Sequence, residues 1–251
     1  MGKGLFITGT DTEVGKTWVT SVLAAAVARR ISLHNAGQGT VLSNPLHLWK
    51  PIQSGSQPGD PRADSFRLLR GSGIEQSEEE TVTYSLKAPL APWMAARRAG
   101  TLIPWEELLA EGERKLASYP RLLVEGAGGL LVPLTERYTV ADLAAAMGLP
   151  LLIVARTRLG TVNHTLLTIE AARQRGLRIA GVLLNGYPGD DDLALSETIE
   201  MIEQFGSVPV LGVFPQLEEE PVSMEEWEAW RDQWIEIVES RIRMDEIMSF
   251  F

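Results

Sequence analysis

The chain has 251 residues, of which 45% are hydrophobic and 22% are charged, so it can bury the core of one large domain or of two small ones. Its formal net charge of −10 argues against non-specific binding to nucleic acid or to an anionic membrane, because either surface would repel it. The absence of cysteine excludes disulfides, thiolate metal sites and cysteine nucleophiles, and it is compatible with a reducing cytoplasm.

The first predicted elements are an apolar strand that starts at Leu5, a glycine-containing loop and an alanine-rich helix. The loop runs from Gly9 to Thr17 and ends in Gly-Lys-Thr, and the helix covers Val19 to Arg30. This order is typical of a phosphate-binding loop, in which backbone N–H groups and a helix N-terminus surround an anion and a lysine adds a full charge. Because Gly9 stands one place earlier than the first glycine of the commonest form, the loop is one residue longer. The alternative is that Lys16 and Thr17 begin an ordinary helix.

The following section contains few regular elements. Short strands are expected at Val41 to Leu42 and at Leu46 to Trp49, the second one ending at Lys50-Pro51. A helix is predicted to begin at Asp64, and Ser77 to Glu80 is expected to be a solvated acidic patch. Pro89 and Pro92 then interrupt the chain before an alanine-rich turn, which is predicted over Met94 to Ala99.

Helices and short apolar strands alternate in the next part of the chain. The predicted helices are Pro104 to Leu116, Val140 to Met147, Thr161 to Arg175 and Leu193 to Phe205. The predicted strands are Arg121 to Glu125, Leu149 to Ala155, Arg178 to Leu184 and Val210 to Val213. Continuous apolar strands, each followed by an amphipathic helix, indicate an α/β protein with a parallel sheet covered by helices on both faces. No apolar run approaches the roughly 20 residues that span a bilayer, and the early first strand leaves no room for a signal peptide, so we expect a cytoplasmic protein.

In a parallel sheet of this kind, ligands bind beyond the carboxyl ends of the strands. Polar and glycine-rich residues collect at those ends, namely Thr8 to Thr17, Glu125 to Gly129, Arg156 to Gly160, Asn185-Gly186 and Pro215-Gln216. Thr17, Asp64 and Glu125 could meet there as oxygen ligands of Mg²⁺. The alternatives are that Asp64 caps a helix and that Glu125 forms a salt bridge at the end of its strand.

Residues 218–251 differ in character from the preceding domain, residues 1–217. Ser223 and Glu226 fit a capping box. An apolar stripe follows at helical spacing and consists of Trp227, Trp230, Trp234, Val238 and Ile242. We expect an acidic amphipathic helix that packs on the domain, and the alternative is a helix that binds a partner.

Four motifs together resemble the dethiobiotin synthetases, which are ATP-dependent enzymes of biotin synthesis with a fold of the P-loop NTPase type. They are Gly9 to Thr17, Lys50 to Gly55, Val124 to Gly129 and Leu159 to His164. The long phosphate loop is the form that this family uses, and the resemblance runs from Leu5 to Leu217. It departs at Pro92-Trp93-Met94, where the family commonly has Pro-His.

The resemblance implies a reaction. 7,8-Diaminopelargonic acid would take up CO₂ as a carbamate, and ATP with Mg²⁺ would phosphorylate that carbamate. The second amine would then close the ureido ring to give dethiobiotin, ADP and phosphate. Such chemistry requires clamped phosphates, neutralised charge on the γ-phosphoryl group and two substrate ends held in register.

The resemblance also implies roles for individual residues. The catalytic residues would be Lys16 on the β- and γ-phosphates, Lys50 on the carbamate and the transferring phosphoryl group, and Thr12 near the carbamate. The ATP-binding residues would be Glu13, Val14, Gly15, Lys16, Thr17, Trp18, Asp64, Glu125, Gly126, Ala127, Gly128, Asn185, Gly186, Pro215, Gln216 and Leu217. Thr17, Asp64 and Glu125 would hold the magnesium.

The substrate would contact Ser54 and Thr12, and its carboxylate would bind at Gly160 and Asn163 of a neighbouring subunit. A homodimer is therefore implied, with no nucleic acid and no membrane as partner. For His164, a role in capping or packing is favoured over a role as a base.

Three other classes of protein compete with this hypothesis. Amide-forming ligases of the cobyric and cobyrinic acid type carry a glutaminase domain with a cysteine nucleophile, whereas this chain has no cysteine. Partitioning and metallochaperone ATPases typically bring an extra lysine early in the loop, where this chain has Thr10-Asp11-Thr12. Slow ATP turnover that ignores the diamine would favour that class. A pure binding module would leave Lys50 and Glu125 unexplained.

Overall fold

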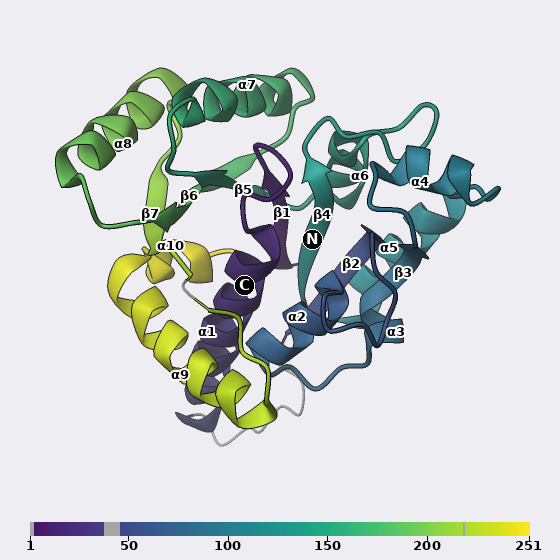
Figure 1. Ribbon diagram of the computed structural model, residues 1–251, viewed down its shortest axis with the longest axis horizontal. Helices are drawn as coiled ribbons and strands as arrows, with labels where there is room; N and C mark the ends of the chain where they lie inside the picture. The colour runs from purple at the N-terminus through teal and green to yellow at the C-terminus, as the bar shows by residue number, and fades with distance from the viewer. Residues whose placement is uncertain (1–2, 38–45, 218) are drawn as a thin grey trace.

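A parallel sheet of seven strands forms the centre of the molecule (Figure 1). The computed structural model describes residues 3–37, 46–217 and 219–251, so the strand expected at Val41 to Leu42 lies outside the described residues. The strands are β1 (Lys3–Gly9), β2 (His47–Ser54), β3 (Val82–Leu86), β4 (Arg121–Gly129), β5 (Leu151–Arg156), β6 (Ile179–Tyr187) and β7 (Val210–Pro215). Their order across the sheet is β3-β2-β4-β1-β5-β6-β7, which places β1 and its loop near the middle.

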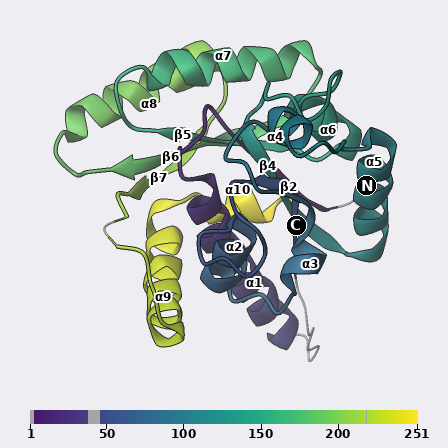
Figure 2. The same cartoon turned by 45° about the vertical axis from the view of Figure 1, so that its right-hand side comes forward.

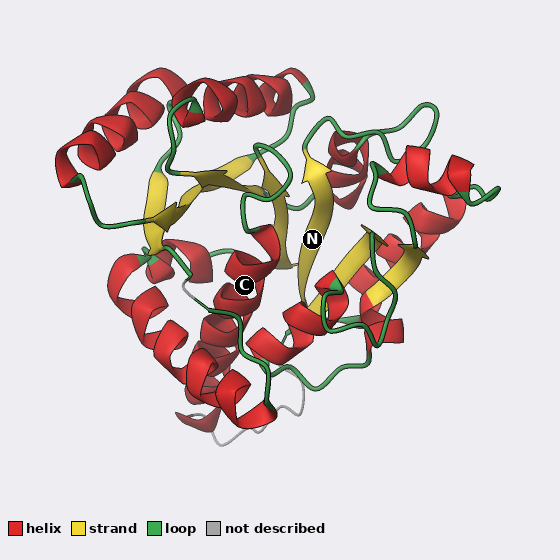
Figure 3. Cartoon of the chain, viewed as in Figure 1, coloured by secondary structure: helices red, strands yellow, loops and turns green. Residues whose placement is uncertain are grey.

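Helices cover both faces of this sheet (Figures 2 and 3). They are α1 (Lys16–Gly37), α2 (Asp64–Ser72), α3 (Glu78–Thr81), α4 (Pro92–Arg98), α5 (Trp105–Ser118), α6 (Val140–Met147), α7 (Thr161–Gln174), α8 (Asp192–Gly206), α9 (Met224–Arg241) and α10 (Met244–Met248). No helix in the described ranges is both long enough and apolar enough to cross a membrane.

Successive side chains of β1 enter different hydrophobic cores. Leu5 and Ile7 of β1 pack in the core under α1, α2 and α9, whereas Phe6 packs in the core under α5, α6 and α7. Because both faces of the strand are buried, Leu5, Phe6 and Ile7 are all apolar, and this accounts for the continuous apolar runs in the sequence. The predicted α/β fold is confirmed.

The region between α1 and α5 is more regular than the sequence suggested. Helix α1 continues to Gly37, and β2 passes through Lys50-Pro51 to Ser54 instead of ending there. The ladder between β2 and β4 ends at Trp49, so the missing N–H of Pro51 leaves no gap in it. Helix α3 begins within the segment that was expected to be a solvated patch. A capping box starts it, in which the side chains of Ser77 and Glu80 each accept a hydrogen bond from the backbone N–H of the other. Strand β3 and helix α4 were also not predicted.

The C-terminal helix predicted from the apolar stripe is present as α9, and it lies beside α1 (Figure 1). All five residues of the stripe are buried, including Trp227, which stacks on Trp18 of α1 with ring centres 5.7 Å apart. Arg29 of α1 forms an ion pair with Glu236 at 2.8 Å. The stripe is therefore part of the core of this chain, and a further short helix, α10, follows it.

A buried histidine at the start of β2 gives the fold a dependence on pH. His47 is 2% exposed, its ring stacks on Tyr119, and its Nε2 lies 3.4 Å from Lys115 Nζ. Its Nδ1 has no hydrogen-bond partner among the described residues. Burial, together with the charge of Lys115, lowers the pKa of His47 from 6.5 to about 4.

We expect this histidine to destabilise the protein in mild acid. The histidine binds a proton near pH 6.5 in the unfolded chain but only near pH 4 in the folded chain. The free energy of unfolding is therefore unaffected by this histidine above pH 6.5, and it decreases as the pH falls from 6.5 toward 4. The free energy of unfolding should drop by about 2 kcal/mol between pH 7 and pH 5, measured by urea denaturation. His47→Phe keeps an aromatic ring against Tyr119 and should remove most of this drop. The same drop in both proteins would contradict the assignment.

Candidate active site

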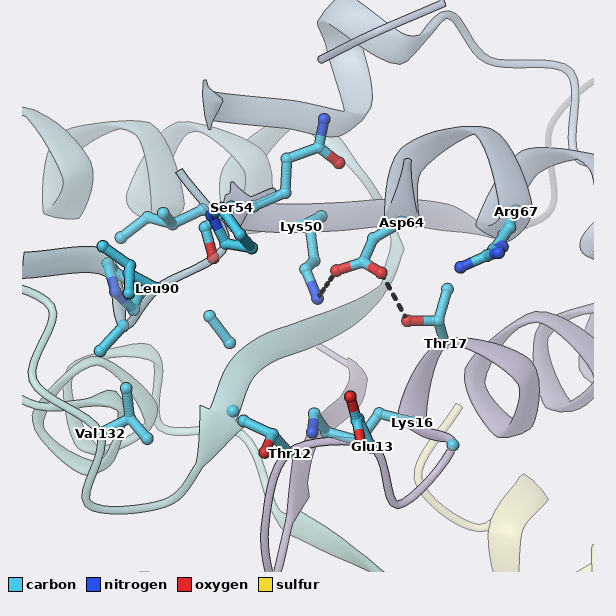
Figure 4. Close-up of a pocket in the computed structure, with 18 of the residues that line it drawn as sticks. Thr12, Glu13, Lys16, Thr17, Lys50, Ser54, Asp64, Arg67, Leu90 and Val132 are labelled. Carbon is cyan, nitrogen blue, oxygen red and sulfur yellow. Dashed lines mark hydrogen bonds and ion pairs between the residues drawn. The ribbon is translucent and has the colours of Figure 1, made fainter. Parts of the chain in front are cut away.

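A cavity of about 650 Å³ opens at the carboxyl ends of the central strands (Figure 4). It is bounded by the loop between β1 and α1, the end of β2, the start of α2, the glycine-rich end of β4 and the loop before α4. Its lining residues are Thr12, Glu13, Gly15, Lys16, Thr17, Trp18, Lys50, Ile52, Gln53, Ser54, Asp64, Arg67, Pro89, Leu90, Ala91, Pro92, Ala127, Gly128 and Val132.

The loop between β1 and α1 has the backbone of an anion-binding loop. Gly15 has a φ of +83°, and a Cβ at this position would lie 2.1 Å from Nδ2 of Asn185. That same Nδ2 donates a hydrogen bond to the carbonyl oxygen of Val14 at 2.9 Å. The amide of Asn185 thus holds the loop directly before the N-terminus of α1, whose first N–H groups have no partners within the helix.

The early glycine, Gly9, leaves room for the side chain of Lys16. Lys16 Nζ donates to the carbonyl oxygen of Asp11 at 3.0 Å, and a Cβ on Gly9 would lie 2.9 Å from this Nζ. Arg156 at the end of β5 holds the other side of the loop, because its Nη2 lies 3.0 Å from Asp11 Oδ2 and 3.2 Å from the carbonyl oxygen of Thr12. The longer loop therefore folds back over the lysine.

Burial and the nearby charge of Lys50 lower the pKa of Lys16 to about 8, although Glu125, Asp64 and Asp11 act in the opposite direction. The charged form of Lys16 is thus less favoured than that of a solvent-exposed lysine. A bound anion would stabilise it.

Lys50 forms a buried ion-pair network with two carboxylates. Its Nζ lies 2.6 Å from Glu125 Oε1 and 2.8 Å from Asp64 Oδ2. Burial alone would lower the pKa of Lys50, but the charges of Asp64 and Glu125 and the hydrogen bonds to them outweigh burial and raise it. Burial would likewise raise the pKa of Asp64, but the charge of Lys50 and the hydrogen bonds from Lys50 and Thr17 hold it below its usual value.

Three oxygen-bearing side chains meet beside Lys50. Oγ1 of Thr17 lies 3.1 Å from Asp64 Oδ1 and 2.9 Å from Glu125 Oε1. Oε2 of Glu125 is buried without a hydrogen-bond partner in the described part of the chain. No group of three His, Cys, Asp or Glu residues that could hold a metal occurs in the described ranges. The set of Thr17, Asp64 and Glu125 offers two carboxylates and one hydroxyl. This set fits Mg²⁺, which takes one or two carboxylates from the protein and the rest of its oxygens from phosphates and water.

The residues expected at the site differ in where they lie. Most of them line the cavity, and these are Thr12, Glu13, Gly15, Lys16, Thr17, Trp18, Lys50, Ser54, Asp64, Ala127 and Gly128. The carbonyl oxygen of Gly126 accepts a hydrogen bond from Lys50 Nζ at 3.3 Å. Glu125 contacts the lining residues Thr17 and Lys50 from the end of β4.

The expected adenine contacts lie on neighbouring strand ends. Asn185 and Gly186 belong to β6, and Pro215 ends β7. The N–H of Gln216 donates to the carbonyl oxygen of Tyr187 at 2.9 Å, which holds the turn of Gln216 and Leu217 beside the end of β6. None of these residues lines the large cavity, and Asn185 lies behind the phosphate loop.

Gly160 and Asn163 also lie outside the large cavity. Gly160, with a φ of +92°, precedes the first residue of α7, and both residues are exposed. A second hollow of about 370 Å³ adjoins Thr12 and Val132 and is lined by His164. The chain therefore does not bring the start of α7 into the large cavity by itself.

Several lining residues were not predicted from the sequence, and Arg67 is the one with a charge. It follows Asp64 by three residues on α2, so helical spacing would have put both on one side of the helix. Ile52 and Gln53 belong to the part of β2 that lies beyond the predicted end of this strand. The loop from Pro89 to Pro92 carries no signal of this kind, because its place beside the cavity depends on packing between distant segments.

Comparison with known proteins gives consistent results. The family model of the AAA domain matches residues 3–220. The chain is 43% identical over 217 residues to the ATP-dependent dethiobiotin synthetase BioD of Bacillus thuringiensis (strain Al Hakam), with 86% of this chain and 85% of the relative covered. It is 44% identical to the protein of that name from Bacillus cereus (strain G9842), with the same coverage. A ParA family ATPase from Chlorobium tepidum TLS shares only the fold, with a TM-score of 0.53, 12% identity and coverage of 99% of this chain and 97% of that one.

Proposed function

The chain belongs to the family of ATP-dependent dethiobiotin synthetases, and from this premise we propose how its own residues perform the reaction. As a member of this family it is an ATP-dependent ligase that forms C–N bonds. One amine of 7,8-diaminopelargonic acid adds to CO₂ as a carbamate, and a carbamate oxygen attacks the γ-phosphorus of ATP to release ADP. The second amine then attacks the carbonyl carbon, phosphate leaves, and the ureido ring of dethiobiotin closes.

The observation that carries this proposal is the position of Lys50. Lys50 lines the same cavity as Gly15 and Lys16 of the phosphate loop, and ion pairs with Asp64 and Glu125 hold its ammonium group in place. A triphosphate on the loop and a carbamate beside Lys50 would therefore meet inside one cavity. Positioning and charge neutralisation are the main requirements of phosphoryl transfer.

The residues predicted for the site then have distinct roles. Lys16 binds the β- and γ-phosphates, and Lys50 stabilises the carbamate and the charge that develops on the transferring phosphoryl group. Thr12 lies near the carbamate, and Ser54 contacts the substrate. Glu13, Val14, Gly15, Trp18 and the segment Gly126, Ala127 and Gly128 complete the ATP site.

Thr17, Asp64 and Glu125 would hold Mg²⁺, since they present oxygens that converge at the end of the phosphate loop. The bound metal would neutralise charge on the β- and γ-phosphates. Asn185, Gly186, Pro215, Gln216 and Leu217 would contact the adenine, which is supported by their place at the ends of β6 and β7. A reaction that consumes ATP is also in keeping with a cytoplasmic location.

A homodimer would complete the substrate site. Gly160 and Asn163 at the start of α7 would bind the substrate carboxylate of the neighbouring subunit through free N–H groups. Exposed apolar side chains near this helix support such an interface, namely Leu131, Leu159 and Leu167. Light scattering of the purified protein tests this proposal, and a monomer at the concentration of the assay would contradict it.

The test of the proposed function is product formation. The protein is incubated with 7,8-diaminopelargonic acid, bicarbonate, ATP and Mg²⁺, and dethiobiotin is detected by its mass. We expect one ADP per dethiobiotin and little ADP when the diamine is omitted. Equal ADP release with and without the diamine, and no dethiobiotin, would instead support a partitioning-type ATPase.

A further inference from the structure

Arg67 is a cation in the cavity that the reaction described above does not use. It lies on α2 one helical turn after Asp64 and lines the same cavity as Lys16 and Thr17. In Figure 4, its side chain descends from α2 on the same side of the cavity as Thr17. Its side chain is 24% exposed, so it is partly desolvated and yet open to a ligand.

Two contacts hold the plane of this guanidinium. Nε lies 2.7 Å from Oε1 of Glu220, and Nη2 lies 2.8 Å from Oε2 of the same carboxylate. The guanidinium carbon lies 5.6 Å from the centre of the Trp18 ring, which in turn stacks on Trp227 of α9. Nη1 makes no hydrogen bond within the described ranges of the chain. Three of the five N–H donors, two of them on Nη1, therefore remain available on a fixed plane.

The charges of the cavity also favour a role for this residue. The ammonium of Lys50 is engaged by Asp64 and Glu125, and Lys16 donates to the backbone of Asp11. A guanidinium also stays charged at any physiological pH. Its planar donors match the oxygens of a phosphate group better than a single ammonium does.

We propose that Arg67 binds the phosphate chain of the nucleotide through its Nη1 edge, and that Glu220 and Trp18 position it for this contact. The inference rests on the proposed binding of ATP in this cavity. It gives the segment that leads into α9 a part in the nucleotide site, because Glu220 holds the guanidinium from there. Glu220 is a positioning residue, and Arg67 is a binding residue.

The first test compares two arginines of the same helix. Arg70 lies over the ring of Phe66 and does not line the cavity, so Arg70→Ala is the matched control. Arg67→Ala should raise the Kd for Mg·ATP, measured by titration calorimetry, roughly 10- to 100-fold, the loss expected for a charged hydrogen bond. The KM of Arg67→Ala for the diamine should change less than about twofold. For Arg70→Ala, both the Kd for Mg·ATP and the KM for the diamine should change less than about twofold. Arg67→Lys should recover part of the affinity, because it restores the charge without the fork.

Inorganic tripolyphosphate tests which part of the nucleotide Arg67 contacts. As a competitive inhibitor of the wild-type protein, it should bind more weakly to Arg67→Ala by a factor similar to that for ATP. A loss of ATP affinity with unchanged inhibition by tripolyphosphate would mean that Arg67 contacts the nucleoside, and this would overturn the proposal.

The role of Glu220 is tested by a double-mutant cycle. Glu220→Ala should weaken ATP binding less than Arg67→Ala does, and it should have no further effect when Arg67 is already alanine. Additive losses would show that Glu220 does not act through Arg67 and would remove it from the proposal.

The inference and the proposed function can fail separately. If the wild-type protein forms dethiobiotin and folded Arg67→Ala binds ATP as the wild type does, the role of Arg67 is wrong and the function stands. If the wild-type protein forms no dethiobiotin and Arg67→Ala still weakens ATP and tripolyphosphate binding, the function is wrong and the role of Arg67 stands. Circular dichroism of each variant confirms that it is folded.

Discussion

Replacing Lys16 with alanine is expected to abolish dethiobiotin formation. The variant loses the ammonium that would face the β- and γ-phosphates, in a cavity where Lys50 is already paired with two carboxylates. Removing such a contact from a water-poor phosphoryl-transfer site should lower kcat/KM for ATP by roughly a thousandfold or more. The measurement is the initial rate of dethiobiotin formation, followed by mass detection over a range of ATP concentrations.

Lys87→Ala is the control for the loss of a lysine, because Lys87 is exposed and does not line the cavity. It should retain full activity. Normal product formation by Lys16→Ala would refute the assignment of Gly9 to Thr17 as the phosphate-binding loop, since Lys16 is the cationic residue in the sequence of that loop.

Lys50→Ala is expected to lower kcat by about two to four orders of magnitude while Mg·ADP still binds. Lys50 lies on β2, apart from the phosphate loop, and its ammonium faces the place where the carbamate and the γ-phosphoryl group would react. Its loss removes charge stabilisation in the transition state and leaves the anchoring of the β-phosphate intact. The two measurements are turnover at saturating substrates and the Kd for Mg·ADP by titration calorimetry.

The same substitution also leaves Asp64 and Glu125 without their shared cation. In the absence of nucleotide and substrate, Lys50→Ala should therefore unfold at a lower temperature than the wild type. Lys115→Met is a control for this effect, because Lys115 is 6% exposed and lies beside His47, outside the cavity. It should also lower stability but leave kcat nearly unchanged. If folded Lys50→Ala retained normal turnover, Lys50 would have no role in the chemistry.

Local patterns were sufficient for most of the sheet and for its covering helices. Strands such as β1 and β5 are continuous apolar runs, and α6 begins and ends where its periodicity predicted, at Val140 and Met147. The prediction was wrong where a polar residue interrupts a buried strand. Lys50 and Pro51 indicated the end of β2, because a lysine inside a strand is rarely buried unless it is paired. Its partner Glu125 is 75 positions away in the chain, so the pairing could not be inferred from the neighbouring residues.

The sequence by itself determined the phosphate loop and the C-terminal helix. Both depend on short-range features, namely the glycines and Lys16 of the loop and the caps and apolar spacing of α9. Only the tertiary structure decided that Lys50 is neutralised by Asp64 and Glu125, and that Glu220 lies against Arg67 from 153 positions away. The physical reason is that backbone conformation follows from a few adjacent residues, whereas a contact between distant side chains exists only after the sheet and its helices have packed.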